Sequence, residues 1–582
     1  MTSAVFTMGF LALLIIPTQV PAYDWAVCPT VSIKTDIDVE FSDSEKRLIC
    51  GDPSGDSTQA WVLVPPRQAQ FHLKAMLQTR GFHNSTYQVE GNKLIVNLGD
   101  TTKIQKITTT GAPSQLNVQR KRHIVGEDLT PQKLDELRDW IKLELQHLGY
   151  ACPDMELQAD VVTGEVVVNI KVGPKLLISK LTSQDVPHLL PGVLRRYDAF
   201  KIGQEFDIHR VTLTEKRLLD EDLVSGTYFD EKCEATELVL SQSVLPGPPR
   251  LFRIGAGFDT EQGPVFKLSW RHARLGKRGT SIENTILTTY RIQEFRSDIK
   301  WYFTKEPSRF FLRPTVEVRR EKEEKYELLK SQIGFFPATT WDSHDARWDV
   351  QAGPSWHIEK TTVGVGPSST QNIFLNSQIH WTTHQFEYYK RNPQSGSKLS
   401  LDFTTGHQGF LSQVTAQKIE LHGQVLWNYK EYDPPLWVFG VRGGIASTLS
   451  VNNEGDINNL PQNFRYHLGG SRDIRGFSRK ELPTGKSGSL SMAYLGTEIR
   501  FLEPLPYRLQ PFIFVDGGVL SQKPAHFDWP LYWSPGLGMR WASPIGVFRG
   551  EAGHGYIHDP LQRPVDSSLS HWQFYLAYGD EF

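Results

Sequence analysis

The stretch LFRIGAGFDTEQGPVFKLSW, residues 251–270, decides how most of this sequence folds. On both sides of its turn-forming centre, DTEQGP, every second residue is apolar. The residues between them are polar or glycine, including Arg253 and Lys267. The apolar positions that share one face are Phe252, Ile254, Ala256, Phe258, Phe266, Leu268 and Trp270. A period of two predicts a pair of β-strands with one apolar face.

The same alternation continues through residues 250–582, for example in KLSLDF, LWVFGVRGG, AYLGTEIRF and PFIFVDGG. Aromatic residues gather at the strand ends, as they do at the two interfaces of a membrane β-barrel. No helical pattern is available to cover the apolar faces. A strand with its connection takes roughly 20 residues, which predicts an all-β transmembrane barrel of about 16 antiparallel strands. The alternative, a soluble β-propeller, requires a blade repeat that the sequence lacks.

The chain before residue 250 contains a different repeat. The segments KAMLQTRGF, residues 74–82, and KLELQHLGY, residues 142–150, share the frame Leu-x-x-x-Gly-aromatic. In each, a helix is expected to end at a glycine cap before the next strand. A looser copy follows at residues 217–229, and strand-like pairs flank each copy. The pattern predicts a β-α-α-β-β unit of roughly 70–75 residues, repeated about three times.

These patterns divide the chain into predicted domains. The repeats are expected at residues 23–101, 102–174 and 175–249, and the barrel at residues 250–582. The apolar run at residues 4–16 is too short to span a membrane. We interpret residues 1–22 as a signal peptide cut after Ala22, although no charge precedes the apolar run. A buried N-terminal helix is the alternative.

Composition limits the classes of function. A net charge of −2 over 582 residues gives no basic footprint for nucleic acid. The four cysteines fit no zinc-binding pattern, and the histidines show no metal-ligand spacing, so no metal site and no cofactor are expected. In an exported protein, Cys28 and Cys50 are candidates for a local disulfide. Cys152 and Cys233 either pair or stay free. No nucleophile elbow or phosphate-binding loop is present, so we expect no enzyme.

The stretch LGGSRDIRGF, residues 468–477, places several charges where a barrel would make them costly. An arginine inside a narrow barrel needs a carboxylate partner. Strand alternation in FIFVDGG and LGTEIRF turns Asp516 and Glu498 toward the lumen, each beside glycines that leave room for a loop. We therefore predict that Arg475 pairs with both acids. The alternative is a solvated surface loop.

The motif Arg475-Gly476-Phe477, together with the repeats, resembles the BamA/TamA outer-membrane assembly family. In that family the repeats are POTRA domains in the periplasm, and the motif lies on an extracellular loop that folds back into the barrel. The hairpin at residues 251–270 is similar to the first hairpin of these barrels. The resemblance implies the same pairing of Arg475 with Asp516 and Glu498, as a lock that holds the loop in the lumen.

The last strand, HWQFYLAYGDEF, resembles the C-terminal recognition signal of outer-membrane barrels. The residues that carry this resemblance are Phe574, Leu576, Tyr578, Gly579 and Phe582. In the family the seam between the last and first strands is short and serves as a lateral gate. The alternative is an ordinary closing strand. We interpret the charge run RREKEEK, residues 319–325, as a solvated barrel loop.

The resemblance implies a non-enzymatic outer-membrane assembly factor. It would assist the insertion or secretion of outer-membrane proteins such as autotransporters. Its partners would be unfolded clients, outer-membrane lipid and a TamB-like periplasmic protein anchored in the inner membrane. The alternatives are an export channel of the two-partner secretion type and a general BamA-like insertase. A barrel lipase lacks a Ser/His pair in this sequence, and a passive porin has no use for POTRA repeats.

Overall fold

The computed structural model describes residues 23–35, 39–52, 63–234, 237–304, 309–390, 393–450, 457–502, 505–543, 546–561, 569 and 571–579. The predicted signal peptide lies outside these residues, as does Phe582. The chain forms two compact units. The first comprises Met1–Glu144 and Pro153–Val172, and the second comprises Leu145–Cys152 and Gly173–Phe582.

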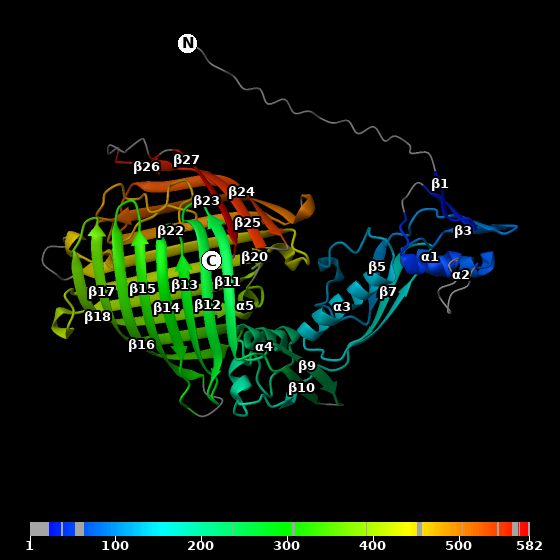
Figure 1. Cartoon of the computed structure of the whole chain (residues 1–582), viewed down its shortest axis with the longest axis horizontal. Coiled ribbons are helices and arrows are strands. Elements are labelled where there is room, and N and C mark those ends of the chain that lie inside the picture. Colours follow the sequence, from blue (N-terminus) through cyan, green and yellow to red (C-terminus); the bar gives the residue numbers. More distant parts are fainter. Residues whose placement is uncertain are drawn as a thin grey trace, which may run out of the picture. The chain divides into compact units, whose positions relative to one another are not determined.

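The first unit opens with a four-stranded sheet of order β1-β2-β4-β3 (Figure 1). Its elements are β1 (Tyr23–Cys28), β2 (Val31–Thr35), α1 (Asp43–Cys50), α2 (Pro66–Thr79), β3 (Thr86–Glu90) and β4 (Lys93–Asn97). A capping box of Ser42 and Glu45 starts α1. Buried Leu73 and Leu77 of α2 pack against Leu94 of β4. A disulfide joins Cys28 and Cys50, which ties β1 to the end of α1.

A second sheet, of order β5-β7-β6, follows along the chain. Its elements are β5 (Lys106–Thr110), the 3-10 turn η1 (Val118–Arg120), α3 (Pro131–His147), β6 (Asp154–Ala159) and β7 (Glu165–Lys171). Strands β5 and β7 are parallel, whereas β6 and β7 are antiparallel. Alternate residues of β7, beginning with Val166 and Val168, are buried. The helix between β5 and β6 provides the crossover that a parallel pair requires.

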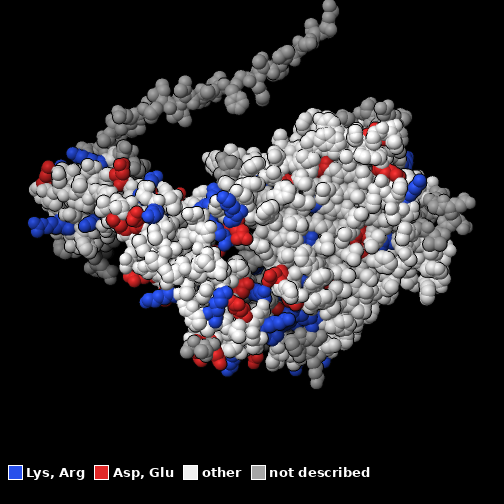
Figure 2. All heavy atoms as spheres, turned by 180° about the vertical axis from the view of Figure 1, so that it is seen from behind, with Lys and Arg blue, Asp and Glu red and all other residues white. Residues whose placement is uncertain are grey.

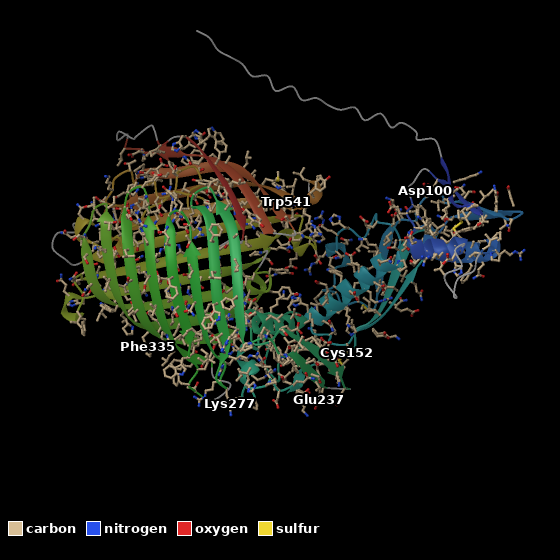
Figure 3. The ribbon with its side chains drawn as sticks, viewed as in Figure 1. Asp100, Cys152, Glu237, Lys277, Phe335 and Trp541 are labelled. Atoms are coloured by element: carbon tan, nitrogen blue, oxygen red, sulfur yellow. A yellow bond between two sulfur atoms is a disulfide. The ribbon has the colours of Figure 1, made fainter. Side chains whose placement is uncertain are left out.

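The second unit contains a third small sheet, of order β8-β10-β9. Its elements are β8 (Ile178–Ser183), the 3-10 turn η2 (Val193–Tyr197), α4 (Ile208–Asp220), β9 (Gly226–Cys233) and β10 (Leu238–Leu245). Cys152, labelled in Figure 3, forms a disulfide with Cys233. The first of the two helices predicted in the later repeats is only a turn of 3 or 5 residues. In η2 the cause is local, because Pro191 and the left-handed Gly192 immediately precede it.

The rest of the second unit is a closed antiparallel β-barrel of 16 strands, as predicted (Figure 1). Its labelled strands are β11 (Arg250–Asp259), β12 (Gly263–Leu275), β13 (Thr280–Thr288), β14 (Ile292–Lys300), β15 (Phe310–Lys322), β16 (Glu327–Ser343), β17 (Ala346–Val363), β18 (Ser369–Thr383), β19 (Gly396–Gly406), β20 (Ala416–Asn428), β21 (Trp437–Ser450), β22 (Ser491–Phe501), β23 (Leu509–Ser521), β24 (Leu531–Ser543), β25 (Gly546–His554), β26 (Tyr556–His558) and β27 (Trp572–Gly579). The labels β25 and β26 are two parts of one strand, since both pair with β24.

The barrel wall has an apolar outer face. Ile254 on β11 is 84% exposed, and Ile513 and Val515 on β23 are also exposed, whereas Asp516, which follows Val515, is 0% exposed. Phe335 and Trp541, labelled in Figure 3, belong to the same outward set. Figure 2 shows this wall as an almost uncharged expanse on the visible face. Among the described helices, none is long and apolar enough to cross a membrane.

Strand direction fixes which connections share an end of the barrel. Strand β11 leaves the end next to the third small sheet, so the turns β16–β17 and β18–β19 return to that end. The β18–β19 turn carries the short helix α5 (His384–Tyr388). The connection from β21 to β22 belongs to the opposite end. Its described part, residues 457–490, is called the luminal loop below.

Candidate functional site

The luminal loop packs inside the barrel, although loops are usually solvated. Leu468, Ile474, Phe477 and Leu482 of this loop are each 0% exposed. They form one apolar cluster with Leu520 and other residues of the barrel wall. The loop is therefore part of a core, and the residues that hold it there define the candidate site.

Arg475 lies at the centre of the loop's polar contacts and is 0% exposed. Its Nε and Nη2 donate to the two carboxylate oxygens of Asp516 at 2.7 and 2.8 Å. Nη1 donates to Glu498 at 2.6 Å and to Glu551 at 3.3 Å. The guanidinium also lies over the Phe514 ring, 3.4 Å from its centroid. A two-pronged, fully desolvated pair of this kind has high geometric specificity.

The carboxylates around Arg475 are shared with other strands. Glu498 on β22 also accepts from Arg500 at 2.6 Å and from Arg549 at 3.0 Å. Arg549 on β25 lies 3.0 Å from Glu551 as well. The network thus connects β22, β23 and β25 through one loop side chain. Removal of any carboxylate would leave a cation without its buried partner, which is the costly case for an interior ion pair.

Gly476 and Phe477, the other two residues of the motif, fit closely against the barrel wall. A Cβ atom built on Gly476 would lie 2.5 Å from the Gly555 nitrogen and 2.5 Å from the Ser534 hydroxyl oxygen, so no side chain fits. The ring of Phe477 meets that of Tyr532 edge to face, with centroids 5.7 Å apart. The glycine is required by this close approach to the wall, because its φ is not in the left-handed region.

The charge run at residues 319–325 is a second anchor for the loop and corrects the interpretation as a solvated loop. Residues up to Lys322 belong to β15. Glu321 and Glu323 are buried, where Lys480 pairs with Glu321 and Arg479 lies 3.0 Å from Glu323. The run was misread because its partners stand more than 150 residues later in the chain.

The seam between β11 and β27 is short. Among the described residues, two pairs join these strands, Phe258 with Tyr578 and Asp259 with Ala577. By contrast, β27 pairs along its whole described length with β25. Residues 250–257 of β11 have no partner on β27 among the residues that the structure describes. Within the described part of the chain, a row of backbone groups at this edge of β11 is therefore available for pairing.

The predicted gate residues that the structure describes all lie on β27, on one side of this seam. Phe574 is 70% exposed and Leu576 is 50% exposed on the outer face of β27. Gly579 pairs with Val547 of β25 rather than with β11. Phe582 lies outside the described residues. The Leu576 carbonyl accepts from the Thr260 N–H at 3.0 Å, which extends the contact by one residue beyond β11.

The luminal loop contacts both sides of the seam. Ser471 Oγ donates to Glu261, in the β11–β12 turn, at 2.6 Å. On the other side, the Tyr575 hydroxyl of β27 donates to the Phe477 carbonyl at 2.6 Å. Since Arg475 lies between these contacts in sequence, one loop joins the first hairpin, the last strand and the lumen wall.

Helix α4 lies across one end of the barrel. The luminal loop enters the barrel from the opposite end. Arg217, near its C-terminus, contacts Asp342 at 2.8 Å and Glu387 of α5 at 2.6 Å. Glu221, at its C-cap, contacts Arg271 of β12, and Lys300 of β14 at 2.6 Å. The helix is thus held at two separate parts of the rim, and we call this arrangement the cap.

Charge keeps the cap in place. Burial opposes ionisation of Glu221, but Lys300 and Arg271 outweigh it and lower the pKa of its carboxyl to about 2. A lowered pKa means that this contact stabilises the folded form above the ordinary pKa of glutamate and is lost only as pH falls toward 2. The cap therefore keeps this charge throughout the neutral range.

The sequence interpretation missed several of these residues. Glu551 and Arg549 alternate with Phe548 and Ala552 in FRGEAGH, so the same rule that turned Asp516 inward would have found them. Tyr575 alternates with Phe574 and Leu576 in the same way. The contacts of α4 carry no comparable sequence signal, because α4 and its partners on the barrel rim are far apart in sequence and meet only in the folded structure.

Residues 338–575 match the Omp85 superfamily domain. The fold is similar to a crystal structure of BamA from Haemophilus ducreyi that lacks POTRA domains 1–3, with 14% identity, a TM-score of 0.50, and coverage of 82% of this chain and 100% of that chain. CdiB from Acinetobacter baumannii matches at 13% identity and a TM-score of 0.46, over 88% of this chain and 97% of that chain.

The Omp85 domain match and the likeness to BamA confirm the predicted fold class. The chain is an outer-membrane β-barrel protein whose N-terminal α/β region resembles POTRA domains and faces the periplasm. Proteins with an Omp85 superfamily domain, BamA and CdiB among them, act in transport and insertion without catalysis. The end of the barrel next to α4 is accordingly the periplasmic end.

We predict that Gly476→Ala prevents the loop from seating and lowers the fraction of folded barrel, because the added methyl group meets backbone at Gly555. Heat-shift electrophoresis of membrane-extracted protein measures this fraction. Gly485→Ala is the matched control in the same loop, since nothing lies within 4 Å of its Cβ position. Equal folded fractions for the two variants would contradict the prediction.

We predict that Arg217→Glu loosens the cap, because it places a third acid beside Asp342 and Glu387. The mean ion conductance of single barrels in a planar lipid bilayer should rise at least about twofold, since a loosened α4 no longer lies across the barrel end and the charged rim then attracts ions into the lumen. Arg138→Glu, on the exposed face of α3, is the control. A normally folded Arg217→Glu barrel with unchanged conductance would refute a role for these ion pairs.

Proposed function

We propose that this chain, whose barrel carries an Omp85 superfamily domain, is the outer-membrane subunit of a translocation and assembly module. In this role it assists the insertion or secretion of outer-membrane proteins such as autotransporters. Clients enter the membrane through the seam between β11 and β27, which acts as a lateral gate. Its periplasmic partner is a large TamB-like protein anchored in the inner membrane.

The observation that carries this proposal is the seam, in which the described residues form two pairs beside an edge of β11, residues 250–257, that has no described partner on β27. A closed barrel normally removes every strand edge, because an open edge pairs with other chains. Here the edge is a template to which an unfolded client strand adds by β-augmentation. The client's backbone groups are then satisfied before they enter the hydrocarbon region, which meets the main constraint on chains in membranes.

The luminal loop supports the gate proposal. Its contacts to Glu261 and Tyr575 hold the two sides of the seam at the outer end, while Arg475 fixes the loop to the wall. The seam can therefore open toward the periplasm without loss of these contacts. In this account the predicted lock of Arg475, Asp516 and Glu498 keeps the barrel in register while the gate moves.

The three small sheets support a periplasmic docking role. Each sheet ends in edge strands, such as β3 in the first and β6 in the second. Three of these units precede the barrel, which favours the assembly-module role over that of a two-partner secretion transporter with two POTRA domains. The boundaries at residues 23–101, 102–174 and 175–249 stay predictions, although the sheets lie within them.

The experiment that separates the candidate functions is a pull-down of tagged protein from native membranes, followed by mass spectrometry. Enrichment of one very large inner-membrane-anchored periplasmic protein supports the proposed module. Enrichment of small outer-membrane lipoproteins favours a general BamA-like insertase, and recovery of one secreted protein favours a dedicated exporter. Either of the latter results would replace the proposal.

We predict that a crosslink across the seam stops client insertion. Phe258→Cys with Tyr578→Cys places two thiols at paired positions of β11 and β27. After oxidation, the variant in proteoliposomes should fold an outer-membrane client at least about tenfold more slowly, because the template edge cannot open. Leu421→Cys with Ile445→Cys, between β20 and β21, is the matched control. Equal client folding by both crosslinked barrels would exclude the lateral gate.

A further inference from the structure

A cavity of about 770 Å³ lies in the barrel lumen. The luminal loop contributes Arg472 and Arg475 to its wall, and helix α5 contributes Phe386 and Glu387. Its volume falls in the range of pockets that bind small molecules. Neither the lateral gate nor the Arg475 lock needs an open space of this size.

Cations outnumber acids where the loop meets the wall. Arg442, Arg475, Arg500 and Arg549 form ion pairs with the carboxylates of Glu498, Asp516 and Glu551. Asp473 is one further acid close enough to interact electrostatically with Arg442. Lys398 and Arg472 line the same cavity and add two more cations. The surplus of positive charge is therefore a property of this cavity and not of a single side chain.

Three of these cations lack a close carboxylate partner of the kind that Arg475 has. Lys398 of β19 and Arg472 of the loop form no ion pair with any acid in the part of the chain that the structure describes. Asp473, which follows Arg472 directly, attracts it electrostatically but forms no ion pair with it. Arg442 of β21 comes no closer than 3.6 Å to Asp516, whose two oxygens already accept from Arg475.

The geometry of these residues restricts what could neutralise them. They project from two barrel strands and one loop into one space, and Arg442 is held by the Ser471 and Asp473 carbonyls at 3.0 and 3.3 Å. Like charges that face one cavity raise the free energy of the folded state unless an anion joins them. Guanidinium and ammonium groups together are the residues that bind phosphate oxygens.

We propose that this cavity is a binding site for a phosphate-bearing anion, held by Lys398, Arg442 and Arg472. The phosphate belongs either to a free small molecule or to a lipid headgroup. The site is independent of the lateral gate, since none of the three residues contacts β11 or β27 in the described structure. It provides the luminal loop with a ligand-dependent contact in addition to its fixed ion pairs.

Calorimetry with inorganic pyrophosphate tests the proposal on the full-length protein in nanodiscs of neutral phosphatidylcholine at low salt. We expect saturable binding that weakens as salt is added. The variant Lys398→Ala/Arg472→Ala should bind at least about tenfold more weakly, because it loses two charge-assisted contacts. Lys142→Ala/Arg508→Ala removes the same charge away from the cavity and should bind like the parent.

The outcomes separate the two phosphate sources. Nanodiscs that contain anionic phosphatidylglycerol should weaken pyrophosphate binding if a lipid headgroup already occupies the cavity, and should leave it unchanged if the natural ligand is free in solution. Both results support the site. Absence of pyrophosphate binding to the parent, or equal binding by Lys398→Ala/Arg472→Ala with a normal heat-shift gel, would overturn the proposal.

Discussion

The rest of the structure depends on one constraint, that a positive charge within the barrel must find negative partners. Arg475 is wholly buried and reaches Asp516, Glu498 and Glu551, on three different strands. Desolvation makes each of these groups costly alone, and only their joint geometry makes them tolerable. The loop that carries Arg475 can therefore take few other positions. Gly476 and Phe477, which follow Arg475, fit the barrel interior only in this position. A loop of 34 described residues, 457–490, becomes part of the barrel's interior for this reason.

The fixed loop stabilises the structure on both sides of the short seam between β11 and β27. The loop contacts the first hairpin at Glu261 and the last strand at Tyr575, close to the two residue pairs that close the barrel. At the periplasmic end the ion pairs of α4 provide a second, separate set of charged contacts. The described barrel is thus tightly held at its outer end and across its mouth, while an edge of β11 stays without a partner. Because the other parts of the barrel are held by these contacts, we expect the barrel to open at the seam.

Much of the fold could be predicted because a strand has a strict period of two. That rule placed Phe252 and Ile254 outside the barrel and Asp516 inside, whereas the number of strands followed from the length of the segment. It applied equally to Glu551, which was overlooked because no motif drew attention to it. The charge run at Glu321 and Glu323 was misassigned, because the local sequence of a solvated charged residue does not differ from that of one buried beside a distant partner. Likewise, the pairing of Cys152 with Cys233 and the contacts of Arg217 depend on distant elements.

The central claim is that Arg475 and Asp516 stabilise the barrel as a pair. The most direct measurement is a double-mutant cycle with Arg475→Ala and Asp516→Ala, in which urea unfolding in lipid vesicles gives the free energy of unfolding of each variant. The account predicts that each single change costs about 3–5 kcal/mol, as for other broken buried pairs. The double variant should cost less than the sum, with a coupling free energy of at least about 1 kcal/mol. Additive costs would contradict the claim, because the two side chains would then act independently.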